Sequence, residues 1–100
     1  MGVKQRFDSV WYAVEDTRQE AARMRARSEL LMHLTEVIRL QGLTQRDAAK
    51  FFGVTQPRIS DLMRGKIGLF SLDTLFDMAT TAGMEPIIQV SLTQNVTQNT

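Results

Sequence analysis

The chain has 100 residues, of which 43% are hydrophobic and 23% are charged, and its formal net charge is +1. This length permits one small domain with a modest core, and the composition is ordinary for a globular protein. Cysteine is absent, which excludes disulfide bridges and thiolate chemistry and favours the cytoplasm as the setting. No apolar run reaches the roughly 20 residues that a membrane-spanning helix needs, and we expect no signal peptide.

The first expected element is a short helix over residues 10–15, capped by Ser9. Residues 1–8 before it show no periodicity. The short helix carries Trp11, the only tryptophan of the chain. This side chain either anchors the segment on the main domain or contacts a protein partner, because tryptophan is enriched at interfaces.

A long helix is expected from residue 18 to about residue 40, because Thr17 and Glu20 form a capping box at its start. Its first half is polar and basic, with Arg18, Arg23, Arg25 and Arg27. These arginines either form a solvated face or contact phosphates or a partner protein. The second half has a broad apolar stripe that predicts the first core helix, formed by Leu30, Leu31, Leu34, Val37, Ile38 and Leu40. Gly42 is expected to end the helix.

Two shorter helices, over residues 45–52 and 56–64, are expected to follow with a tight turn between them. Gly53 suits the turn because glycine readily adopts a positive φ. Thr55 is a good N-cap for the second helix, and Pro57 fits its first turn. The predicted inner faces carry Ala48, Ala49 and Phe52 in the first helix, and Ile59, Leu62 and Met63 in the second. A pair of helices joined in this way is a helix-turn-helix unit, whose second helix enters the DNA major groove.

The charge distribution supports a nucleic-acid partner. Residues 42–68 contain five basic and two acidic side chains, whereas residues 69–100 contain three acidic side chains and no basic one. Positive charge therefore accompanies the helix-turn-helix, where it suits a phosphate backbone. The alternative is that these are ordinary solvated surface charges.

Residues 67–70 are expected to form a loop with apolar side chains, and Phe70 is assigned to the core or its rim. A helix that Ser71 caps is expected to follow through about residue 82, with Leu75 on its buried side and Gly83 at its end, and a strand over residues 87–92 comes last. One strand in a helical chain has no partner for its backbone groups, so we expect it to pair with the same segment of a second copy. The expected dimerisation residues are Ile87, Ile88, Val90 and Leu92. The alternative is a strand that docks on another protein or stays partly ordered.

The stretch LTQRDAAKFFGVTQPRISDLMRGK resembles the XRE (lambda-repressor-like) family of DNA-binding proteins. Gln45 and Gln56 match the glutamines that open the two helices of the family, Gly53 matches its turn glycine, and Arg64 with Gly65 matches its exit. The flanking pieces SELLMHLTEVIRLQG and LFSLDTLFDMATTAGMEPIIQVSL resemble the HigA-type antitoxin branch. The resemblance covers roughly residues 17–92.

Together, the elements and the resemblance predict a mainly α fold, a lambda-repressor-like bundle of about five helices with a C-terminal strand that pairs across a dimer. The expected organisation is an N-terminal extension at 1–27, a helix-turn-helix DNA-binding domain at 28–83, a dimerisation strand at 84–93 and a disordered tail at 94–100.

The expected site consists of base-contacting residues on the second helix and phosphate-contacting residues around it. Gln56 can read an adenine, Arg58 can pair with guanine or reach a phosphate, and Asp61 can accept from cytosine or tie down Arg58 or Arg64. The base-contacting set is Gln56, Pro57, Arg58 and Asp61. The phosphate-contacting set is Thr44, Gln45, Arg46, Ser60, Arg64 and Lys66, of which Thr44 also caps a helix and Arg64 has a plain surface charge as its alternative.

The resemblance implies an antitoxin that represses its own operon at an inverted-repeat operator and neutralises a RelE/HigB-like toxin, a ribosome-dependent ribonuclease. Our hypothesis places the toxin contact on the N-terminal segment through Arg27, with Trp11 and Tyr12. The alternatives are a stand-alone XRE-family repressor and a protein-interaction adaptor that binds no DNA. We expect no enzymatic activity, cofactor or metal, because His33 is the only histidine and cysteine is absent. The expected location is the cytoplasm, in association with the nucleoid.

Overall fold

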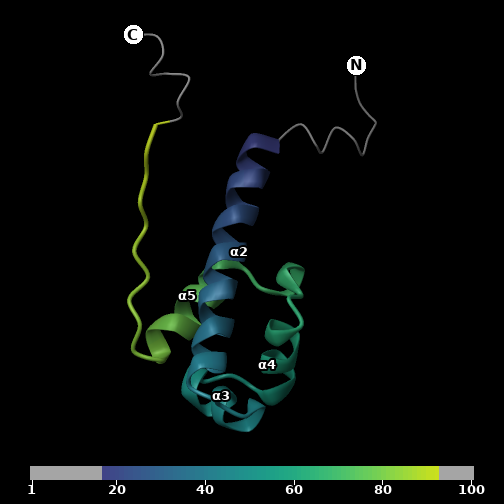
Figure 1. The fold of residues 1–100 in the computed structure, drawn as a ribbon. Helices are drawn as coiled ribbons and strands as arrows, with labels where there is room; N and C mark the ends of the chain where they lie inside the picture. The colour runs from purple at the N-terminus through teal and green to yellow at the C-terminus, as the bar shows by residue number, and fades with distance from the viewer. Residues whose placement is uncertain (1–16, 93–100) are drawn as a thin grey trace, which may run out of the picture.

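The computed structural model describes residues 17–92, and within them the fold is helical (Figure 1). The elements are α2 (Thr17–Leu40), α3 (Gln45–Phe52), α4 (Gln56–Met63), a 3₁₀ turn η2 (Ile67–Leu69) and α5 (Leu72–Thr81). The predicted helix over residues 10–15 and the predicted tail at 94–100 lie outside the described residues. Four of the five expected helices are therefore confirmed. None of the helices in the described part has the length and apolar character needed to cross a membrane.

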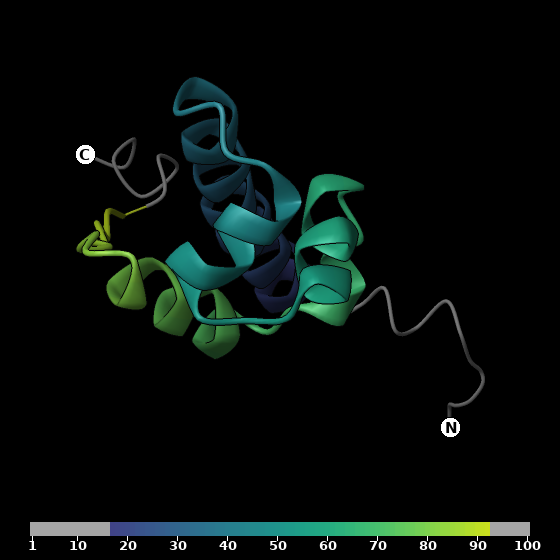
Figure 2. The same ribbon diagram turned by 90° about the horizontal axis from the view of Figure 1, so that it is seen from below.

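One hydrophobic core lies where the four α-helices meet (Figures 1 and 2). All four helices, and Phe70 between η2 and α5, contribute to this core. The largest fully buried side chains of the core are Leu34, Phe52, Ile59, Leu62, Phe70, Leu75 and Met78. Burying a side chain of this size contributes about 1.5–3 kcal/mol, so the core is the main force that holds α3 and α4 in place. The apolar pattern of the sequence indicated all of these positions except Met78.

The two halves of α2 differ in packing. Its buried residues, Leu31, Leu34 and Ile38, all lie in the second half, and the first half extends beyond the rest of the bundle (Figure 1). The prediction that Leu40 belongs to the apolar stripe is wrong, because its side chain is 72% exposed. Leu40 is the last residue of the helix, and the chain turns away there at Gly42, which has a φ of 61°.

The helix ends follow the expected local chemistry. The hydroxyls of Thr44, Thr55 and Ser71 cap α3, α4 and α5, each accepting from the backbone N–H three residues later. Gly53 ends α3 in the left-handed conformation, with φ 69° and ψ 36°. The sequence predicted a loop at residues 67–70, and part of it is the 3₁₀ turn η2. Met63 was expected on the inner face of α4 but is 40% exposed.

The predicted strand is not formed in the described residues. After Met84 donates its N–H to the Ala79 carbonyl, residues 85–92 form no backbone hydrogen bond within the described part of the chain and carry no strand assignment. The segment is extended and runs beside α2 (Figure 1). A strand is defined by pairing, and no second strand exists between residues 17 and 92 to provide it.

Candidate nucleic-acid interface

The orientation of α4 is set from its inner side. Ile59 and Leu62 are completely buried, so this helix cannot rotate without exposing them. At its start the Thr55 hydroxyl accepts from the Arg58 N–H at 3.3 Å, and Pro57 occupies the first turn. A helix of eight residues is marginal alone, and its packing and cap are what hold its outer face in a defined direction.

The outer face of α4 carries the predicted DNA-contacting residues. At about 100° per residue, Pro57, Ser60, Asp61 and Arg64 lie opposite the buried Ile59 and Leu62. Pro57 and Arg64 are exposed, whereas Ser60 and Asp61 are half-buried. Gln56 is also exposed, at the first position of the helix. The polar face is therefore open to solvent at the end of the helix that leads into a major groove.

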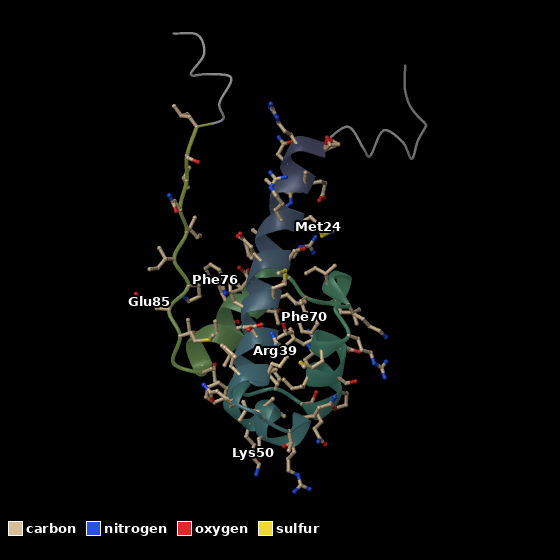
Figure 3. The ribbon with its side chains drawn as sticks, viewed as in Figure 1. Met24, Arg39, Lys50, Phe70, Phe76 and Glu85 are labelled. Carbon is tan, nitrogen blue, oxygen red and sulfur yellow. The ribbon has the colours of Figure 1, made fainter. Side chains whose placement is uncertain are left out.

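Arg58 lies against an aromatic ring. Its guanidinium carbon is 4.7 Å from the centroid of the Phe70 ring, within the range of a cation–π contact. Phe70 is only 1% exposed and lies between α2 and α4 (Figure 3). Sequence reasoning assigned Phe70 to the core or its rim and missed this contact, because the ring lies twelve residues away in a connection that has no helical periodicity.

Asp61 pairs with Lys66 rather than with an arginine. The Asp61 Oδ1 and Lys66 Nζ atoms are 4.0 Å apart, and the Lys66 backbone N–H donates to the Asp61 carbonyl at 3.1 Å. Neither Arg58 nor Arg64 forms a salt bridge with Asp61 in the described residues, so the expected pairing at i±3 is wrong. The bend of the chain after α4 brings Lys66 back to Asp61, and helical spacing alone does not reveal this.

The start of α3 is arranged to bind an anion. The Thr44 hydroxyl accepts from the Asp47 N–H at 3.0 Å, and the Ala48 N–H donates to the Thr44 carbonyl. The N–H groups of Gln45 and Arg46 form no hydrogen bond within residues 17–92. Both residues are exposed, so these N–H groups and the positive end of the helix dipole are available to a phosphate.

Uncompensated positive charge accompanies this surface. Among the described residues, the cations of α3 and α4 that have no carboxylate within salt-bridge distance are Arg46, Lys50 and Arg58. Arg64, the C-cap of α4, also has none there. Lys50 points away from the bundle at the end formed by α3 (Figure 3). Two arginines of α2 do have carboxylate partners, Arg23 with Glu20 and Arg39 with Glu36.

The expected dimerisation residues are separate from this surface. Ile87, Ile88, Val90 and Leu92 are all largely exposed on the extended segment that follows α5. Beside this segment, α2 and α5 border a groove of about 610 Å³ whose lining includes Leu30, Val37 and Phe76. Figure 3 shows Phe76 on the side of the bundle that carries the extended segment.

A helix-turn-helix domain family matches residues 13–91, which is most of the chain. The chain therefore belongs to this family of DNA-binding, XRE-like helix-turn-helix domains. No curated protein matches it. The family agrees with the geometry of α3 and α4.

Proposed function

We propose that this chain is a sequence-specific transcriptional repressor that inserts α4 into the major groove of an inverted-repeat operator. One observation carries the proposal: Ile59 and Leu62 on the inner side of α4 are completely buried, while Gln56, Pro57 and Arg64 are exposed. The helix α3 packs against α4, and within residues 17–92 the first two N–H groups of α3 form no hydrogen bond, so they are available to a phosphate. Gln56, Pro57 and Asp61 are the proposed base-contacting residues on α4.

The proposed repressor is a homodimer. Within the described part of the chain, residues 85–92 form no backbone hydrogen bond, and four aliphatic side chains there are between 67% and 86% exposed. Pairing of this segment with its copy would satisfy the backbone and bury the aliphatic groups. One domain makes few phosphate contacts, so a dimer that reads two half-sites also raises affinity at physiological salt.

The more specific proposal, supported by the sequence resemblance, is the antitoxin of a type II toxin–antitoxin module. The first half of α2 extends beyond the core at the end where the N-terminal segment joins. It exposes Met24, and Met32 is 63% exposed beside the buried Leu31. Residues 17–29 contribute no residue to the core or to the apolar side chains packed on it, and a RelE/HigB-like toxin that packs on this half would explain its length. The proposed location is the cytoplasm, in association with the nucleoid.

DNA binding is tested by gel shift of the purified chain on the duplex upstream of its own gene at two salt concentrations. We expect binding that weakens steeply with salt and that is lost in the double variant Gln56→Ala/Arg58→Ala. The matched control is the double variant Gln19→Ala/Arg25→Ala, which removes the same two types of exposed side chain from the first half of α2, beyond the bundle. If both double variants bind the duplex equally well, α4 is not the DNA-contacting element. That result would favour a protein-interaction adaptor as the function.

Toxin neutralisation is tested by co-expression with the product of the adjacent small open reading frame. We expect rescue of growth and co-purification of the two chains, both lost when residues 1–27 are deleted. The control is the full chain with the Gln56→Ala/Arg58→Ala change. This variant should still neutralise the toxin and rescue growth. DNA binding without any toxin in the neighbourhood would leave the stand-alone repressor as the function.

A further inference from the structure

We infer that Arg58 contacts the DNA backbone rather than a base edge, and that the ring of Phe70 holds its guanidinium in position for that contact. The inference rests on the proposed insertion of α4 into a major groove. The sequence left open whether Arg58 contacts a guanine or a phosphate. The inference assigns base contacts and phosphate contacts to different residues of α4.

The position of Arg58 on α4 places it at the flank of the helix. At about 100° per residue, Arg58 lies about 160° around the axis from Gln56 and about 100° from Pro57. A helix with its side chains is about 10–12 Å wide, which nearly fills a major groove of about 12 Å. The outward centre of such a helix faces the base edges, and its flanks face the phosphate walls. Arg58 is thus directed to a wall. Gln56 lies on the opposite flank, but it is the first residue of α4, at the end of a recognition helix whose residues contact base edges.

The contact with Phe70 keeps Arg58 on that flank. Phe70 is 1% exposed, and it is fixed in the core between α2 and α4. Its ring centroid lies 4.7 Å from the Arg58 guanidinium carbon, and Arg58 itself is half-buried. A guanidinium that stacks through its face leaves its N–H donors directed outward in its plane, where they can reach phosphate oxygens. Gln56, by contrast, has no such contact and is fully exposed.

The charge of Arg58 also remains available. Asp61 is the carboxylate one turn along α4, and it pairs with Lys66 at 4.0 Å instead. No other salt bridge to Arg58 is present in the described residues. A cation that is already ordered by an aromatic ring loses less side-chain entropy when it meets a phosphate than a free surface lysine does.

The test uses the full chain and a duplex that the wild type selects from a random library. Fluorescence anisotropy then compares this duplex with all of its single-base-pair variants at several salt concentrations. For Arg58→Ala we expect the same fold loss of affinity on every duplex, so that base preference is unchanged. The slope of log K against log salt should become shallower by about 0.9 for each bound chain. Gln56→Ala is the comparator, and it should flatten the preference at one base pair.

Arg58→Lys distinguishes the effect of the positive charge from the effect of its position on the Phe70 ring. The fold should tolerate this change better than a substitution of the buried Phe70. Lysine keeps the charge but loses the planar stacking, so we expect the salt slope of the wild type with a weaker affinity. Thermal unfolding of each variant, followed by circular dichroism, confirms that the fold is retained.

Four results would overturn the inference. Loss of discrimination at one base pair in Arg58→Ala would show base reading, and unchanged affinity would show no contact; in both cases the DNA-binding function would stand. If Arg58→Lys binds as tightly as the wild type, Phe70 does not position the cation. A wild type that selects no duplex at all would instead reject the proposed function together with the inference.

Discussion

Gln56 is the residue of α4 that combines an exposed side chain with both a hydrogen-bond donor and an acceptor. At the first position of a helix that enters a groove, such a side chain can pair with an adenine through two hydrogen bonds. Because it contacts nothing in the core, its removal should affect recognition and leave folding unchanged.

We therefore expect Gln56→Ala to weaken operator binding by about 1–3 kcal/mol and to relax specificity at one position of each half-site. The free energy of unfolding should change by less than about 0.5 kcal/mol. Titration of the operator and of its single-base variants measures the first effect, and urea denaturation measures the second. Gln41→Ala, an exposed glutamine after α2, is the matched control and should bind as the wild type does.

Gly53 is the second position where one residue decides the geometry of the site. It has a φ of 69°, and a Cβ atom added there would lie 3.1 Å from the Thr81 Cγ2 atom. Gly42 has a similar φ of 61°, but an added Cβ would meet nothing within 4 Å. The two glycines thus differ in their surroundings while sharing the same left-handed backbone.

We expect Gly42→Ala to destabilise the fold by about 1–2 kcal/mol, the strain of a left-handed alanine. Gly53→Ala should lose more, because the Thr81 side chain must also give way by a few tenths of an ångström. Urea denaturation of both variants provides the comparison. If the two losses are equal, the approach to Thr81 relaxes freely and only the backbone strain matters.

The sequence-based predictions differ most from the structure for contacts between residues that are separated by a loop. The sequence placed Asp61 on the outer face correctly, but its pairing with Lys66 depends on the bend after α4. Phe70 was predicted as core or rim, yet its contact with Arg58 depends on how the connection after α4 places the Phe70 ring beside that helix. Periodicity describes one element at a time, so it cannot show contacts of this kind.

The helices themselves were predictable because their ends depend on local chemistry. Thr44, Thr55 and Ser71 are N-caps in the sequence and in the structure, since each needs only the N–H three residues ahead. The prediction of a strand at 87–92 was wrong because a strand does not depend on local chemistry alone. Its alternation was read correctly as extended backbone, but a strand forms only against another strand, which residues 17–92 do not contain.

The cap of α4 gives a prediction at the scale of the element. Thr55→Ala removes the acceptor of the Arg58 N–H and should cost about 1 kcal/mol of stability, with a range of about 0.5–2 kcal/mol. Thr55→Ser keeps the hydroxyl and should lose much less. Thermal and urea unfolding of both variants measure the difference. Equal losses would mean that packing of Ile59 and Leu62 alone holds this helix.

The whole molecule divides at the middle of α2. All buried residues of this helix begin at Leu31, and the first half contributes nothing to the core in the described part of the chain. The division supports the proposed boundary between an N-terminal extension and a DNA-binding domain that starts at residue 28.

A chain that starts at Ser28 should therefore unfold cooperatively and keep most of its DNA affinity. We expect a loss of less than about 1 kcal/mol, because residues 17–27 are exposed or half-buried and contribute nothing to the core, and surface pairs such as Arg23–Glu20 contribute little. A chain that starts at Glu36 is the contrast, since it lacks the buried Leu31 and Leu34 and should not fold. Circular dichroism and operator titration check both chains; an unfolded first chain would contradict the boundary.

The proposed dimerisation would use the extended segment at the opposite end of the sequence. Ile88 and Val90 alternate with Gln89 and Ser91, so in a paired ribbon they share one face. Each aliphatic side chain that the ribbon buries contributes about 1.5–3 kcal/mol, and a dimer contains two copies of each.

Ile88→Ser with Val90→Ser should then weaken association on the order of 10³-fold or more and lower operator affinity with it. Gln89→Ala with Ser91→Ala changes the other face and should leave a dimer. Sedimentation equilibrium distinguishes the two, and equal dimerisation of both pairs would show that the copies associate through a different surface.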